Sequence, residues 1–186
     1  AFLGRTLAER GVRVVRRTSV PDEPIVIEAA VRESLARTGA VLTTGGLGPT
    51  RDDITKRVVA GIFGAPLEFQ EPLWQALIER YRRLGRVPVE SNRSQAEVPR
   101  GATVLVNRRG SAPGLWLEGK PGLVVMLPGV PHEMQHLLLD QVVPRLAERA
   151  GGRVVRSRMV RTAAIGESVL AERLGGIDQA VAPLSL

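Results

Sequence analysis

The sequence contains no cysteine, and that absence excludes several kinds of chemistry. There can be no disulfide framework, no thiolate metal site and no cysteine nucleophile. Aromatic residues make up only 3% of the 186 residues. Proteins that read single-stranded nucleic acid stack bases on aromatic side chains, so nucleic acid is not an expected partner.

Long apolar runs and a secretory signal are also absent, so we predict a cytoplasmic protein with no membrane partner. The net charge is +7, and 24 of the 26 basic residues are arginine. A high-GC genome produces that bias as readily as a nucleic-acid partner does, so the charge leaves the prediction unchanged.

Strand and helix patterns alternate along residues 1–150, which is typical of an α/β domain. Strands are predicted at 12–20, 40–44, 103–106, 114–118 and 122–128, and helices at 1–11, 21–38, 52–64, 71–86, 89–97 and 131–150. We predict a three-layer, doubly wound fold with a mainly parallel sheet. Pro144 should kink or split the last helix.

Both ends of the sequence suggest an incomplete unit. The chain starts in a helix that no strand precedes, so we expect the domain over residues 1–150 to lack its first strand. Residues 152–186 read as a basic strand, a glycine turn and a helix. We interpret them as the truncated start of a second domain.

The stretch "VLTTGGLGPTRDD" follows the apolar part of a predicted strand and is unusually rich in glycine. Glycine lets the backbone adopt positive φ and approach a ligand closely, and threonine hydroxyls can donate hydrogen bonds. This pattern suits a phosphate or a nucleotide-like ring, although neither Walker A nor the dinucleotide fingerprint is present. The alternative is a plain turn in which Thr50 caps the next helix and Asp53 completes a capping-box pair.

Two adjacent aspartates beside an anion site imply a cation, because bare carboxylates and phosphates repel each other. Mg²⁺ or a similar divalent ion is therefore expected. Asp52 lies four residues before Lys56, and we expect it in an exposed ion pair on the helix rather than in the site.

Three ordered motifs carry a family resemblance: "TTGGLGPTRDDIT" at 43–55, "SNRSQAEVPRGATVLVNRRGSAPG" at 91–114 and "LPGVPHEM" at 127–134. Together they resemble the MoaB/Mog molybdopterin-binding domain, in the version found at the N-terminus of CinA (competence/damage-inducible) proteins. The tail "RTAAIGESVLAERL" is similar to the start of the KH-type domain that follows in CinA. On this resemblance we expect the sequence to lack the nicotinamide mononucleotide deamidase domain of that family and its opening strand with a Gly-(Asp/Asn)-Glu-Leu motif.

The resemblance implies a metal-dependent pyrophosphatase acting on ADP-ribose or a related dinucleotide, with a monovalent cation as an optional second cofactor. Asp53 and Asp22 would be catalytic and would hold the metal together with Glu133. The ligand-binding residues implied are Thr43, Thr44, Gly45, Gly46, Gly48, Ser111 and Gly129.

Simpler interpretations stay open for several of these residues. Asp22 could cap a helix, Glu133 could complement a helix dipole, and "GSAPG", which contains Ser111, could be an ordinary hairpin turn. His132 and His136 lack the H-E-x-x-H pattern and are expected at the surface. The whole domain could be a non-catalytic pterin- or nucleotide-binding and oligomerisation module serving the deamidase.

A homodimer is predicted from the helix at 71–86. Trp74, Leu77 and Tyr81 form an apolar stripe on it, with arginines at 80, 82 and 83 beside the stripe. The alternative is that the stripe packs inside the chain.

Overall fold

The computed structural model describes residues 2–151 and 161–177. The chain divides into two compact units, residues 1–155 and 156–186. The elements of the first unit are α1 (Phe2–Glu9), α2 (Pro24–Thr38), β1 (Ala40–Thr44), α3 (Thr55–Ile62), β2 (Leu67–Phe69), α4 (Glu71–Arg83), η1 (Glu90–Ala96), β3 (Glu97–Pro99), β4 (Thr103–Leu105), β5 (Gly114–Gly119), β6 (Gly122–Leu127), α5 (Pro131–Leu137), η2 (Leu138–Val142) and α6 (Val143–Arg149).

The main sheet has the strand order β1-β6-β5-β4. β1 and β6 pair in parallel, whereas β5 pairs with β6 and with β4 in antiparallel register. A second, two-stranded sheet is formed by β2 and β3, which pair antiparallel. The predicted layered α/β fold class is confirmed, and in the described main sheet one strand pair is parallel and two are antiparallel.

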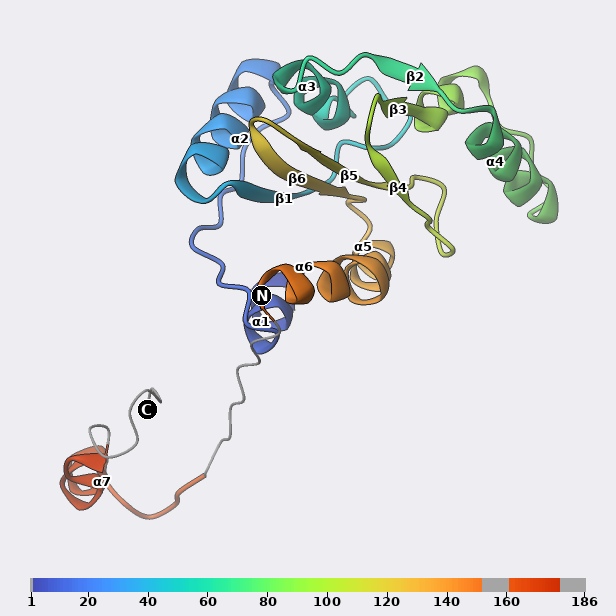
Figure 1. Ribbon diagram of the computed structural model, residues 1–186. Coiled ribbons are helices and arrows are strands. Elements are labelled where there is room, and N and C mark those ends of the chain that lie inside the picture. The colour runs from blue at the N-terminus through green and yellow to red at the C-terminus, as the bar shows by residue number, and fades with distance from the viewer. Residues whose placement is uncertain (1, 152–160, 178–186) are drawn as a thin grey trace. The chain divides into compact units, whose positions relative to one another are not determined.

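Helices cover both faces of the main sheet, with α2 and α3 on one face and α1, α5 and α6 on the other (Figure 1). The central strand β6 shows why both layers form. Val124 and Met126 belong to the buried cluster beneath α2 and α3, and Leu123, Val125 and Leu127 belong to the cluster on the opposite face. Alternate side chains of a strand point to opposite faces, so an almost continuous apolar run fits a strand covered on both sides.

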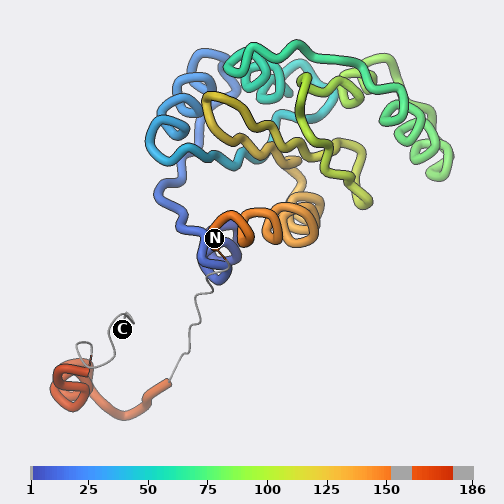
Figure 2. Tube along the Cα trace, in the orientation of Figure 1, coloured from blue at the N-terminus to red at the C-terminus, as the bar shows by residue number. Residues whose placement is uncertain are grey.

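The segment 12–20 is not a strand, so that prediction is wrong. It belongs to neither sheet. Val14, Val15 and Val20 are exposed, and Val12 packs partly buried against the core. The path of this segment between α1 and α2 is seen in the tube view (Figure 2). Charged arginines interrupt its apolar residues, and Arg16 pairs instead with Glu33 of α2 at 2.8 Å. The short strands β2 and β3 were not predicted.

The helix predicted over 131–150 is divided, as Pro144 suggested. Residues 138–142 form a π-helical turn between α5 and α6. Proline has no N–H and crowds the preceding turn, so a wider turn just before it removes the conflict.

In the second unit the structure describes α7 (Glu167–Leu174), where a helix was predicted. The basic strand predicted at the start of this unit falls on residues 152–160, outside the described residues. A KH-type domain therefore stays a prediction. No helix among the described residues is long and apolar enough to span a membrane.

Candidate functional site

The site lies where the parallel strands β1 and β6 end side by side. Thr44 is opposite Leu127 in the register, and the Gly45 N–H donates a hydrogen bond to the Leu127 carbonyl at 2.9 Å. A Cβ added to Gly129 would lie 3.3 Å from the Gly45 Cα. The loop after β1 and the loop after β6 therefore leave the sheet in direct contact. Ligands of open α/β sheets bind at this edge.

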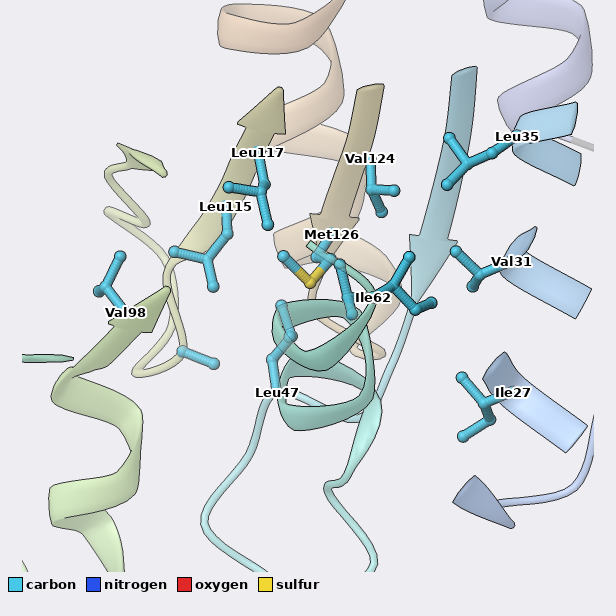
Figure 3. Close-up of a cluster of buried hydrophobic side chains, with 12 residues drawn as sticks. Ile27, Val31, Leu35, Leu47, Ile62, Val98, Leu115, Leu117, Val124 and Met126 are labelled. Atoms are coloured by element: carbon cyan, nitrogen blue, oxygen red, sulfur yellow. The ribbon is translucent and has the colours of Figure 1, made fainter. Parts of the chain in front are cut away.

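The glycine loop, residues 45–48, is held by one buried side chain. Leu47 is 3% exposed and belongs to the cluster that contains Ile62 and Met126 (Figure 3). Gly45 and Gly46 have φ of +95° and +70°, a region that other residues rarely adopt. A Cβ on Gly46 would also lie 2.0 Å from the Thr55 Oγ1. The loop is thus a fixed backbone surface.

Asp53 closes this loop from its far end. Its Oδ2 accepts hydrogen bonds from the Thr50 N–H at 2.9 Å and from the Thr50 hydroxyl at 2.6 Å. A Cβ on Gly48 would lie 2.5 Å from the same oxygen. Partial burial alone would raise the pKa of Asp53, but the hydrogen bonds from Thr50 and Gly48 and the charge of Lys56 lower it overall. Asp53 is therefore an anion in the site.

The Thr50–Asp53 pair is not a helix cap. α3 begins at Thr55 after Ile54, which makes no side-chain cap hydrogen bond. The capping-box interpretation correctly paired Thr50 with Asp53. It was wrong to place this pair at the start of helix α3. The pair closes the loop before the helix and orients the carboxylate.

Lys56 is buried, with 5% of its surface exposed, and its ammonium donates a hydrogen bond to the Ser94 carbonyl of η1. Burial lowers its pKa to about 8, against the opposing effects of the carboxylates of Glu97 and Asp53; the neighbouring Arg57 adds to the lowering. The predicted surface pair with Asp52 is therefore wrong. Through its hydrogen bond to Ser94, Lys56 instead links helix α3 to η1.

A relay of side-chain hydrogen bonds runs from α4 to Ser111. The Asn92 amide donates to the Tyr81 hydroxyl at 3.2 Å and to the Gln95 Oε1 at 3.1 Å. The Gln95 amide then donates to the Ser111 Oγ at 3.1 Å. Because the Ser111 oxygen accepts that bond, its own proton is available to a further acceptor. Asn92 and Gln95 are 4% and 3% exposed, so the relay is rigid.

The turn that carries Ser111 is also tied to helix α5. The Asn107 amide donates to the Ala112 carbonyl at 2.8 Å and to the Glu133 carboxylate at 2.6 Å, while its Oδ1 accepts the Gly110 N–H at 2.9 Å. A Cβ on Gly110 would lie 1.7 Å from the Glu133 Oε2. Glu133 therefore supports the turn, a role that the sequence interpretation did not assign to it.

These contacts and short stretches of chain between them form a closed ring that includes the glycine loop. The ring runs through Gly45 and Gly129, Glu133 and Asn107, Ser111 and Gln95, Ser94 and Lys56, and Asp53 and Gly48. Thr43 lies near the end of β1, and its buried Oγ1 has no hydrogen-bond partner in the described part of the chain. Thr44, the next residue, is exposed.

Asp22 is not part of this ring. It is exposed in the loop before α2, whose N-cap position is Glu23, so the helix-cap interpretation of Asp22 is also wrong. Within residues 2–151 and 161–177, no group of three or more His, Asp or Glu side chains could hold a metal ion. The three acids predicted as ligands, Asp22, Asp53 and Glu133, are therefore not brought together as a metal site.

The two histidines stand apart from the site chemistry, as expected. His132 is exposed, whereas the His136 side chain is partly buried and lies 3.1 Å from the Asp140 carboxylate within the same helical segment.

The residues of the apolar stripe on α4 pack against other parts of the same chain. Leu77 is 5% exposed, the Tyr81 hydroxyl accepts from Asn92, and the Trp74 ring lies 5.4 Å from the Arg93 guanidinium. The stripe therefore no longer argues for a dimer, which stays a prediction.

The sequence interpretation gave no site role to four polar residues that form or support the ring. They are Lys56, Asn92, Gln95 and Asn107. Asn92 and Gln95 lie three residues apart, a spacing that places them on one face of a helical turn, and this was the available signal. Lys56 carried none, because a lysine beside aspartates usually lies in solvent.

With this geometry established, comparisons with known proteins give the family. Residues 1–148 match the family model described as "Probable molybdopterin binding domain". A CinA-like protein of Gemmatimonas aurantiaca is 52% identical over 185 residues, which is 97% of this chain and 43% of that protein. The chain belongs to the molybdopterin-binding domain family, in its CinA-like branch. It spans less than half the length of the CinA-like relatives it matches, including one from Chloroherpeton thalassium that is 42% identical.

One solved structure supports the same assignment, and a second shows the fold. The CinA protein from Thermoplasma acidophilum superposes with a TM-score of 0.68 at 32% identity, over 78% of this chain and 85% of that chain. A molybdopterin biosynthesis protein from Mycobacterium abscessus shares the fold, with a TM-score of 0.50 at 18% identity over 81% of this chain and 80% of that chain.

The family assignment corrects the predicted activity. The prediction of a metal-dependent ADP-ribose pyrophosphatase is wrong, because the family that matches residues 1–148 is described by molybdopterin binding. The coarser statement holds: this is a CinA-type, molybdopterin-binding-family domain.

Proposed function

We propose that the ring at the ends of β1 and β6 binds a phosphate-bearing ligand with a pterin-like or nucleotide-like ring. The observation that carries this proposal is the gathering of the glycine loop, the Ser111 turn and the Gly129 loop into one closed set of contacts. A few convergent polar groups beside a backbone free of side chains are typical of ligand sites.

Each part of the ring has a chemical role in this proposal. The glycine loop offers backbone that a flat ring can approach, since Gly45 has no atom within 4 Å of the Cβ it lacks. The Ser111 hydroxyl donates a hydrogen bond to a ligand oxygen, because the Gln95 amide occupies its acceptor side. Thr43 supplies a second hydroxyl, because its oxygen has no hydrogen-bond partner in the described part of the chain.

The divalent ion stays a prediction, and the structure limits which residues could bind it. The described residues do not make a metal site of their own. Mg²⁺ commonly binds through one or two carboxylates and completes its shell with water and substrate phosphate. In that arrangement Asp53 would be the protein ligand, and the ion would bind only together with a phosphorylated molecule. The monovalent cation, the homodimer and the cytoplasmic location also stay predictions.

The experiment is a titration with molybdopterin, followed by the fluorescence of its pterin ring, of the wild type and two glycine variants. In Gly48→Ala the new methyl group displaces the Asp53 carboxylate, so affinity should fall at least tenfold. Gly61→Ala is the matched control, because its methyl group meets no atom within 4 Å on helix α3. Equal affinity of the two variants would count against the proposal.

A further inference from the structure

Lys56 is the only charged residue that is buried in the described part of the chain. It is also one of just two lysines, with Lys120, in a chain whose other basic residues are arginines. Taking a charge out of water costs free energy, and an apolar side chain of similar length would fill the same space without that cost. Packing alone therefore gives no reason for a lysine at this position.

The ammonium of Lys56 joins two parts of the ring that are far apart in the sequence. Lys56 lies in the first turn of α3 and donates a hydrogen bond to the Ser94 carbonyl of η1, 38 residues further along the chain. Within the described residues, no other side-chain hydrogen bond or ion pair connects α3 to η1. Lys56 is therefore the polar link between these two elements.

Both ends of this link lead directly to a part of the proposed ligand site. On the α3 side, the residue before Lys56 is Thr55, whose Oγ1 would lie 2.0 Å from a Cβ added to Gly46 of the glycine loop. On the η1 side, the acceptor carbonyl is followed by Gln95, whose amide donates to the Ser111 Oγ at 3.1 Å. Lys56 thus lies midway on a short path from the glycine loop to the Ser111 hydroxyl.

The position of Gln95 determines where the proton of the Ser111 hydroxyl can point. A hydroxyl that accepts a fixed hydrogen bond directs its own proton away from that donor. Asn92 fixes the Gln95 amide by donating to its Oε1 at 3.1 Å. Hydrogen bonds from charged donors are stronger than neutral ones, so the bond of the ammonium to the Ser94 carbonyl is a strong restraint on the residue next to Gln95.

We propose that Lys56 is a positioning residue of the ligand site, which links the glycine loop to the Ser111 turn through η1 and so orients the Ser111 hydroxyl toward the bound ligand. The inference rests on the proposed function, because it concerns the same hydroxyl and the same ligand. Lys56 needs no contact with the ligand in this role. Its effect on affinity should depend on the Ser111 hydroxyl, whereas the effect of a bare positive charge on an anionic ligand would not.

The test is a double-mutant cycle, in which the pterin fluorescence of molybdopterin measures its affinity for the full chain. Lys56→Met alone should weaken binding about fivefold, a loss in the usual range for one hydrogen bond. In a Ser111→Ala background the same change should weaken binding less than about twofold, because the group that Lys56 orients is gone. Lys120→Met is the matched control, since it removes the other lysine, which is exposed in the turn between β5 and β6. It should leave affinity unchanged.

A second cycle separates positioning from a general loss of structure. In a Thr43→Val background, Lys56→Met should still weaken binding about fivefold, because the Thr43 hydroxyl is not on the path through η1. Gln95→Met removes the next step of that path and should show the same dependence on Ser111 as Lys56→Met. Lys56→Gln, which keeps a polar side chain but shortens it, provides the same test if Lys56→Met does not fold.

Equal losses from Lys56→Met in the wild-type and Ser111→Ala backgrounds would overturn the inference, because Lys56 would then act by its charge or on the structure as a whole. Unchanged affinity of Lys56→Met would overturn it as well. In both cases, binding that stays sensitive to Gly48→Ala and Ser111→Ala leaves the proposed function intact. If neither of those two changes weakens binding, the proposed function fails, and the role of Lys56 fails with it.

Discussion

The side-chain amide of Asn107 donates a hydrogen bond of 2.6 Å to the Glu133 carboxylate, and this contact joins the turn before β5 to helix α5. Asn107 also donates to the Ala112 carbonyl and accepts from the backbone of Arg109 and Gly110. One side chain therefore fixes the shape of the turn that presents Ser111. Loss of the Asn107 side chain should therefore destabilise this turn.

Asn107→Ala should lower the free energy of unfolding by about 1–3 kcal/mol, since it leaves several backbone groups and a carboxylate without a partner. Glu133→Gln should change stability by less, because a Gln carbonyl can still accept the Asn107 amide proton. Urea unfolding of both variants measures the difference. If Glu133→Gln destabilises as much as Asn107→Ala, the charge of Glu133 has a role beyond supporting the turn.

Thr43→Val should raise the free energy of unfolding by about 1 kcal/mol. The valine keeps the shape of the side chain and removes a buried hydroxyl that has no partner in the described part of the chain. The same change should weaken molybdopterin binding, since the proposed function gives that hydroxyl to the ligand. A variant that is less stable and binds normally would contradict both expectations.

Lys56 should make stability depend on pH above neutrality. Its pKa in the folded chain is about 8, below the ordinary value of 10.5, so between these values the unfolded chain binds more protons than the folded one. The free energy of unfolding contributed by Lys56 therefore rises with pH across that interval, by at most about 3 kcal/mol. Lys56→Met should lack this rise. Parallel pH profiles of the wild type and the variant, measured by urea unfolding from pH 7.5 to 10, would show that Lys56 does not titrate in this window.

Asp53→Asn tests the predicted divalent ion. If an ion bridges Asp53 and the ligand phosphate, the wild type should bind molybdopterin more tightly in Mg²⁺ than in EDTA, and the variant should show no such difference. Without an ion, the carboxylate repels the phosphate, and Asp53→Asn should then tighten binding in EDTA. An Mg²⁺ effect of equal size in both proteins would place the ion elsewhere.

The sequence predicted the layered fold and the position of the glycine loop because both depend on local patterns. The apolar run of β6 and the positive φ of Gly45 and Gly46 are readable from neighbouring residues. Leu47 is different: its burial depends on α3 and β6 meeting above the loop, and no local pattern reveals that.

The partners of polar side chains were least predictable. Lys56 was expected in solvent, yet tertiary packing places it under η1, 38 residues further along the chain. The convergence of Asp22 with Asp53 failed for a related reason, since it assumed that segment 12–20 was a strand of the sheet. Relations between distant segments determine this site, and a single sequence carries little information about them.

The central claim is that the ring that includes the glycine loop holds the ligand, and amide hydrogen exchange in the presence and absence of molybdopterin tests it most directly. Binding should slow exchange in peptides covering residues 43–48, 110–112 and 127–130, since ligand contact and reduced local opening both protect amides. The exposed helix α7 should be unaffected. Protection confined to other peptides, with these three unchanged at saturating molybdopterin, would contradict the account.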